Sequence, residues 1–156
     1  MPVVATKYFG TMEYQEESVL HLPLGLPAFE SEKRFVLIER PDYAPLVFLQ
    51  SLNEPSLCFL SLPARAIDPA YALAVSDEDR AVLQWGGEAC LGDAGLLALT
   101  LLSLHDGFPP TANLMAPIVV NVQNRRAVQS IRLDRKYSHE HPFVLADLAQ
   151  DSEGAC

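Results

Sequence analysis

The residues best suited to chemistry lie near the end of the chain, at Asp134 and in the run His139-Glu140-His141. Two histidines at positions i and i+2 share one face of a strand, and imidazole and carboxylate groups are the ligands that zinc prefers. This pattern leaves open a small metal-dependent hydrolytic enzyme. No third ligand with a recognisable spacing accompanies the histidines, however, and Pro142 follows at once. Hydrogen-bonded or solvent-facing histidines are the commoner outcome of such a pattern.

A second group of carboxylates, Asp77-Glu78-Asp79, follows Ser76. Consecutive side chains on a helix fan out instead of converging on one cation, so a metal site is disfavoured here. Serine at the N-cap followed by carboxylates in the first turn is typical of a helix start, because both complement the helix dipole. We predict one short helix over about residues 77–85, ended in left-handed geometry by Gly86-Gly87.

Motifs that carry catalysis are missing from the sequence. It contains no G-x-S-x-G, H-E-x-x-H, phosphate-binding loop or dinucleotide fingerprint. Catalysis needs a nucleophile or acid–base group, an orienting partner and an electrophilic pocket, and no stretch of the chain supplies that set. The sequence therefore predicts a non-enzymatic protein without metal or cofactor.

Composition limits the possible partners. The 156 residues carry 20 acidic side chains against 11 Lys and Arg, a formal net charge of −9. Such a surface repels nucleic-acid phosphates, which argues against an OB-type nucleic-acid module and favours a basic protein partner. No signal-peptide pattern and no apolar run of the ~20 residues that span a bilayer occur. We expect a cytoplasmic monomer that contacts neither nucleic acid nor membrane.

Short apolar runs separated by turn residues predict the elements that position these groups. They indicate a mainly β, single-domain antiparallel β-roll or small barrel-like fold over residues 1–145. Residues 146–156 read as an acidic, flexible C-terminal tail. The expected strands are a hairpin or bent strand over Val3–Tyr14, then Val19–Leu22, Phe35–Glu39, Leu46–Leu52, Leu57–Leu62, Ile118–Val122 and an alternating run over Val128–Leu133.

The chain is organised around Pro109–Gln123, whose two halves differ in character. Its first half, up to Pro117, contains three prolines and one asparagine and is therefore stiff. Its second half, Ile118–Val122, is rich in β-branched residues and reads as a buried strand. Two interpretations stay open: a rigid loop that closes a sheet, or a presented surface on which a partner docks.

This stretch also carries a resemblance to a known family. The run Thr111–Asn121, read as T-A-N-L-M-A-P-I-V-V-N, closely resembles the T-A-N-L-x-A-P-I-V-x-N signature of the bacterial flagellar assembly factor FliW family. The resemblance covers about residues 3–143. One departure is Ala28, where the family more often has glycine, which bears on the backbone φ of that turn. Further matching segments are Thr6–Gly10, Gly25–Phe29, Phe48–Ser51, Gln129 and Tyr137–Phe143.

The segment Gly95–Leu104 is ambiguous from composition alone. Its many leucines favour a helix, and periodicity does not separate a helix from a buried strand. The resemblance favours a strand, because members of the family carry β-branched residues here. Asp106-Gly107 would then form the turn that leads into the proline-rich stretch. We predict a strand.

The resemblance implies a partner switch. Members of the FliW family bind CsrA, a small dimeric RNA-binding translational repressor, and so relieve repression of flagellin synthesis. They also bind flagellin, which sequesters them; a chaperone that binds flagellin alone is the related alternative. An acidic chain suits a partner that must be basic to hold RNA.

The stiff loop is the predicted contact surface, because an ordered segment loses little conformational entropy on binding. The competing interpretation is that Asn113 caps the loop backbone while Leu114 and Met115 fill the end of the barrel. The aromatic side chains of Phe29 and Tyr43, which lie beside turns, are secondary candidates. The candidate residues in the loop are Thr111, Asn113, Leu114, Met115, Ala116 and Pro117.

Overall fold

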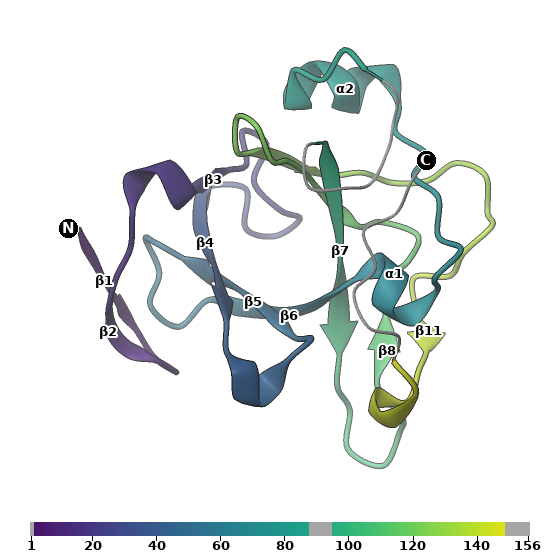
Figure 1. Cartoon of the computed structure of the whole chain (residues 1–156), viewed down its shortest axis with the longest axis horizontal. Helices are drawn as coiled ribbons and strands as arrows, with labels where there is room; N and C mark the ends of the chain where they lie inside the picture. Colours follow the sequence, from purple (N-terminus) through teal and green to yellow (C-terminus); the bar gives the residue numbers. More distant parts are fainter. Residues whose placement is uncertain (1, 88–94, 149–156) are drawn as a thin grey trace.

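A computed structural model describes residues 2–87 and 95–148, and these form a mainly β structure (Figure 1). The helices are α1 (Ala64–Ile67) and α2 (Asp77–Leu83), and single 3₁₀ turns lie at Glu16–Ser18, Pro41–Tyr43 and Leu145–Asp147. The strands are β1 (Val3–Thr6), β2 (Gly10–Glu13), β3 (Leu20–His21), β4 (Arg34–Glu39), β5 (Val47–Ser51), β6 (Cys58–Pro63), β7 (Leu96–Ser103), β8 (Thr111–Ala112), β9 (Ile118–Asn121), β10 (Arg126–Gln129) and β11 (His141–Pro142).

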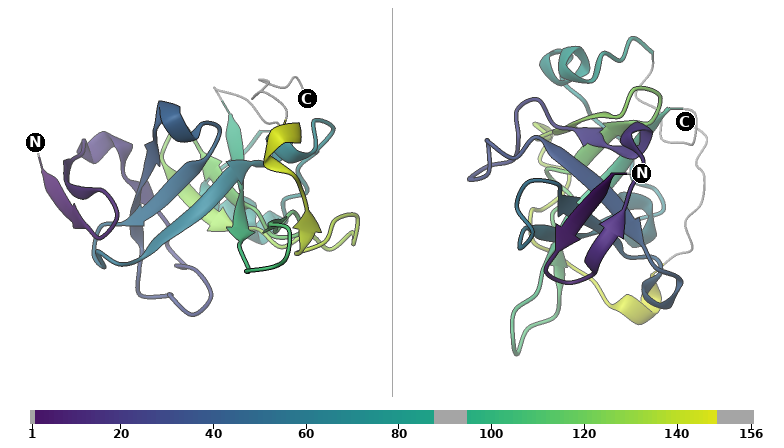
Figure 2. Two further views of the ribbon diagram at one scale, coloured as in Figure 1. Left: turned by 90° about the horizontal axis from the view of Figure 1, so that it is seen from below. Right: turned by 90° about the vertical axis from the view of Figure 1, so that its left-hand side faces the viewer.

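The main sheet closes on itself. Strands β3 to β7 pair antiparallel in sequence order, β9 pairs with both β7 and β10, and β10 meets β3 in parallel through Arg126 and His21. Strands β8 and β11 extend the sheet beyond β7, whereas β1 and β2 form a separate hairpin at the opposite end (Figure 2). This arrangement confirms the predicted mainly β, barrel-like fold.

Two apolar clusters fill the two sides of β7. Alternate side chains of a strand face opposite sides, so Leu99 packs inside the barrel while Leu96 and Ala98 pack beneath α2. Burial on both faces removes the polar positions that would have revealed a strand by alternation. The predicted strand over Gly95–Leu104 is thereby confirmed as Leu96–Ser103.

The helical predictions need two corrections. Helix α2 begins after Ser76 as expected, but it ends at Leu83, where Gln84 takes the left-handed conformation with φ 54° and ψ 43°. Gly86-Gly87 therefore does not end the helix. The expectation of a single helix also missed α1, one turn that follows directly on β6.

Ordered structure continues beyond the predicted domain end at residue 145. A 3₁₀ turn covers Leu145–Asp147, and Leu148 packs against a cluster that contains Leu62, Ala112 and Phe143. Residues 149–156, the rest of the predicted tail, lie outside the described residues. Neither helix of the described chain has the length and apolar character needed to cross a membrane.

Candidate functional site

The predicted contact loop is largely packed into the protein. Leu114 is 0% exposed, and its carbonyl oxygen accepts a hydrogen bond of 2.9 Å from the Tyr71 hydroxyl. Ala116 and Pro117 are buried as well. These three side chains do not lie on the surface, which favours the interpretation of a loop packed on the sheet; their role as partner contacts stays a prediction. The loop carries too many apolar residues to remain solvated, and Leu114 packs into the apolar cluster beneath α2.

The polar members of the loop also make internal contacts. The Asn113 side-chain oxygen accepts a hydrogen bond of 3.0 Å from the Ala116 N–H, the cap that the competing interpretation requires. Thr111 pairs in β8 with Ser103 and Pro142. Thr111, Asn113 and Met115 are half-buried.

The secondary aromatic candidates keep part of their surface. Phe29 is 38% exposed and packs edge-on against Phe59, with ring centroids 5.7 Å apart. Tyr43 is 55% exposed and packs edge-on against Phe48 at 6.1 Å. Each ring therefore packs against a half-buried aromatic ring and is still accessible, and both residues stay predictions as partner contacts.

The residues proposed for metal chemistry have other roles or stand apart. Both oxygens of Asp134 accept hydrogen bonds from Arg132, at 3.1 and 2.7 Å. His141 lies in β11 opposite Ala112, whereas His139 is exposed. In residues 2–87 and 95–148, no three His, Cys, Asp or Glu side chains are grouped so that they could hold a metal ion.

Arg132 organises the segment that follows β10. It is 4% exposed, and its guanidinium lies over the rings of Tyr71 and Tyr137, 5.1 and 4.9 Å from their centroids. It also donates to the Ala72 carbonyl oxygen at 2.6 Å. Burial opposes its charge, but the bonds to Asp134 and Tyr71 outweigh this and raise the pKa of Arg132. In return, the Arg132 bond lowers the pKa of Asp134 to about 2.

Tyr137 completes this arrangement. Its hydroxyl donates a hydrogen bond of 2.6 Å to the Asp68 carboxylate. Burial, followed by that bond, raises the pKa of Tyr137 to about 12. Burial likewise raises the pKa of Tyr71, although Arg132 opposes the rise. The contacts among Asp68, Tyr71, Arg132, Asp134 and Tyr137, which we call the Arg132 network, join residues 68–72 to residues 132–137. They also fix which face of the segment around Arg132 points outward.

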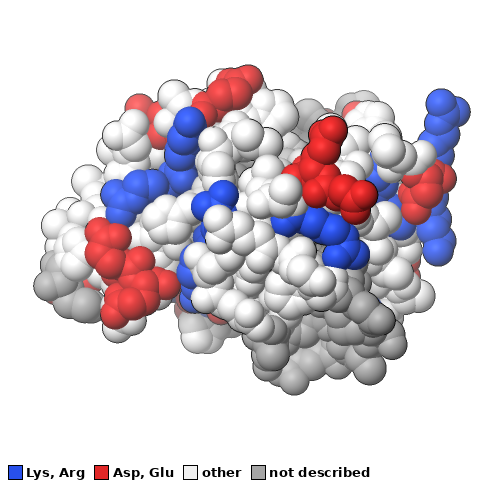
Figure 3. Space-filling view, turned by 90° about the horizontal axis from the view of Figure 1, so that it is seen from above, with Lys and Arg blue, Asp and Glu red and all other residues white. Residues whose placement is uncertain are grey.

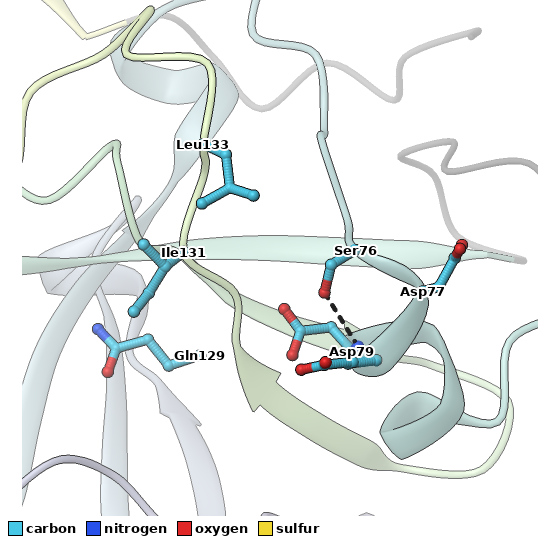
Figure 4. A pocket seen from close by; sticks show the side chains of 7 residues that line it. Ser76, Asp77, Asp79, Gln129, Ile131 and Leu133 are labelled. Atoms are coloured by element: carbon cyan, nitrogen blue, oxygen red, sulfur yellow. Dashed lines mark hydrogen bonds between the residues drawn. The ribbon is translucent and has the colours of Figure 1, made fainter.

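With Arg132 held inward, its neighbours in sequence point to solvent. Ile131 is 58% exposed and Leu133 is 88% exposed. They line a groove of about 470 Å³ between the segment after β10 and the start of α2 (Figure 4). We call this the acidic groove; its lining residues are Ser76, Asp77, Glu78, Asp79, Gln129, Ile131 and Leu133.

Helix α2 is fixed beside the groove at its N-terminal end. The Ser76 hydroxyl oxygen accepts a hydrogen bond of 3.1 Å from the Asp79 N–H, which confirms the predicted N-cap. The Ser130 hydroxyl donates to the Asp79 carboxylate at 2.7 Å, joining the two walls of the groove. Asp77 and Glu78 remain exposed.

The turn between β9 and β10 holds the other end of α2. The side-chain amides of Asn121 and Asn124 donate to the Leu83 carbonyl oxygen at 2.9 and 3.1 Å. The Arg126 guanidinium donates to the Val82 carbonyl oxygen at 2.6 Å. These bonds satisfy carbonyl groups that the end of a helix leaves open. They also explain why α2 ends before the glycines.

Seen from above, charged side chains gather in groups separated by wide uncharged areas, and one acidic group lies over α2 (Figure 3). Exposed carboxylates beside exposed apolar side chains can bind a protein segment that offers basic and apolar groups. Sequence reasoning missed Ile131 and Leu133 as surface residues. The available signal was the alternation over residues 128–133, which does not reveal which face is buried.

The fold and groove define a small β-barrel protein with an acidic, partly apolar groove on its surface. The model of the FliW protein family matches residues 3–143, and the chain belongs to this family. It is 32% identical over 155 residues to the flagellar assembly factor FliW of Syntrophomonas wolfei, covering 99% of this chain and 96% of the relative. It is 37% identical over 139 residues to the flagellar assembly factor FliW of Geobacillus thermodenitrificans, covering 88% of this chain and 92% of the relative. A crystal structure of flagellar assembly factor FliW superposes with a TM-score of 0.79 at 33% identity, covering 90% of this chain and 96% of that one.

Proposed function

We propose that this chain is a non-enzymatic regulator of flagellum assembly, acting in the cytoplasm as a monomer. It binds a CsrA-type RNA-binding repressor, relieves repression of flagellin synthesis and is itself sequestered by flagellin. The observation that carries the proposal is the acidic groove, where exposed carboxylates of α2 stand beside Ile131 and Leu133 on a chain of net charge −9.

Electrostatics supports this role. A repressor that holds RNA presents Lys and Arg side chains, which an acidic surface attracts. Carboxylates docked near the RNA groove also raise the free energy of bringing phosphates close. If this protein and RNA bind different sites on the repressor, the coupling between the two sites is reciprocal. RNA then lowers the affinity for this protein by the same factor as this protein lowers the affinity for RNA.

The test is displacement of a labelled leader RNA from the purified repressor, measured by fluorescence anisotropy at increasing salt. We expect displacement to weaken as salt rises, because salt screens charges on both surfaces. Asp77→Asn combined with Glu78→Gln should weaken it at low salt. The matched control is Glu13→Gln combined with Glu17→Gln, two exposed carboxylates outside the acidic groove. Displacement that does not respond to salt or to the groove variant would contradict the electrostatic account.

A further inference from the structure

We propose that the acidic groove binds an extended segment of a partner protein, which adds as a strand along residues 129–133 and places Lys or Arg side chains against Asp77 and Glu78. This inference rests on the proposed function and names the surface and the mode of contact. Three observations carry it: an unpaired backbone edge, two exposed apolar side chains on that strand, and carboxylates on the facing wall.

The backbone edge follows from the pairing of β10 with β9. The last pair of that ladder is Gln129 with Ile118, and the same register continues beyond it. The N–H of Ser130 donates to the Pro117 carbonyl oxygen at 2.9 Å, and the N–H of Arg132 donates to the Met115 carbonyl oxygen at 2.8 Å. Residues 130–132 therefore continue β10 as an extended chain.

Successive residues of an antiparallel strand direct their N–H and C=O groups to opposite edges. Since the N–H groups of Ser130 and Arg132 bond towards the segment that precedes β9, the N–H and C=O of Ile131 and the N–H of Leu133 face the other edge; the chain bends at Leu133 itself. In the part of the chain that the structure describes, no backbone hydrogen bond engages the N–H or C=O of Ile131 or Leu133. An edge with free polar groups accepts an added strand, which supplies the missing hydrogen bonds.

The side chains on this strand favour the same occupant. Leu133 has the largest exposed fraction, 88%, among the exposed large hydrophobic residues, and Ile131 exposes 58%. The Arg132 network prevents the strand from turning over, which would bury Ile131 and Leu133. An added strand with apolar side chains on the matching face would remove both from water.

The charge of the facing wall selects the partner. Asp77 and Glu78 are exposed, while Asp79 accepts a hydrogen bond from Ser130. A strand in the groove lies beside these carboxylates, so Lys or Arg at alternate positions is attracted and Asp or Glu is repelled. The occupant is therefore a basic and apolar extended segment of a protein.

The test uses the full chain and two labelled peptides, one of alternating lysine and valine and one of alternating glutamate and valine. We expect the lysine peptide to bind and the glutamate peptide not to bind. Ile131→Ser combined with Leu133→Ser should lower the affinity for the lysine peptide and for the purified repressor about tenfold or more, as expected for residues at the centre of a contact. The control Leu104→Ser, also at an exposed apolar side chain (62%), should change neither affinity more than about twofold, since it lies outside the groove.

Amide hydrogen exchange reports the mode of binding. Strand addition predicts that the amides of Ile131 and Leu133 become protected when the lysine peptide or the repressor binds. Failure of the wild-type chain to bind the lysine peptide would overturn the inference, as would binding without protection of these amides. Repressor binding that the groove variants leave unchanged would also overturn the inference while the proposed function stands. If the wild-type chain binds the lysine peptide but not the repressor, the proposed function is wrong instead.

Discussion

The Asn121 side-chain amide donates a hydrogen bond of 2.9 Å to the carbonyl oxygen of Leu83, and both residues are buried. Leu83 is the last residue of α2, and Asn121 is the last residue of the signature run that begins at Thr111. The end of the signature thus holds the helix whose beginning forms one wall of the acidic groove. This links a packed, internal segment to the surface that we propose binds a partner.

Replacing Asn121 should lower stability. Asn121→Ala leaves the buried Leu83 carbonyl with the single bond from Asn124, so we expect a loss of about 1–3 kcal/mol in the free energy of unfolding by urea. Asn124→Ala is the matched control, because Asn124 donates to the same oxygen from an exposed position. Equal stabilities of the two variants would contradict the role assigned to the buried bond.

Asn113 offers a test of the loop. Its side chain caps the Ala116 N–H, so Asn113→Ala should cost about 1 kcal/mol of stability. Because the loop contacts are internal, we expect the folded variant to bind the repressor with unchanged affinity, measured by titration calorimetry. A variant with native stability and lost binding would restore the loop as a docking surface.

Ala28 adopts φ +69°, the left-handed region that glycine occupies more readily. Ala28→Gly should therefore raise the free energy of unfolding by about 0.5–1 kcal/mol, the relief of strain less the added entropy of the unfolded chain. Nearby Gly25→Ala should do the opposite, since φ is +64° and a Cβ would lie 2.5 Å from the Glu30 backbone. Thermal unfolding of both variants checks the pair; destabilisation by Ala28→Gly would contradict the account.

Acid should weaken the Arg132 network. The folded pKa of Asp134 is about 2, below its ordinary 3.8, because Arg132 holds the charged form. The Asp134 carboxylate therefore takes up a proton less readily in the folded state than in the unfolded state. Its contribution to the free energy of unfolding is present above about pH 4 and is lost as pH falls towards about 2. We expect Asp134→Asn to flatten stability against pH in that window, measured by urea unfolding. An unchanged slope would show that Asp134 does not contribute.

Local signals in the sequence predicted much of the fold. Ser76 and the carboxylates after it were enough to locate the start of α2. Alternation over residues 128–133 indicated an extended chain, but β10 covers Arg126–Gln129, its pairing continues only to Arg132, and the chain bends at Leu133. The end of α2 was not predictable in the same way. It depends on Asn121 and Asn124, some forty residues away along the chain, reaching the Leu83 carbonyl.

The candidate site was harder to predict because the alternation over residues 128–133 leaves open which face is buried. Hydrophobicity alone favours burial of a face with isoleucine and leucine over one with serine and arginine. The structure buries Arg132, because Tyr71, Tyr137 and Asp134 come together around it. These contacts join distant segments, and only the tertiary structure brings them together.

The proposed switch between two partners can be followed in a single titration. This protein is titrated into the repressor bound to labelled leader RNA, and purified flagellin is then added while anisotropy is followed. We expect this protein to release the RNA from the repressor, and flagellin to restore RNA binding. If a demonstrably folded chain releases no RNA, the proposed antagonism of the repressor is wrong. Binding of flagellin alone would then leave a flagellin chaperone as the function.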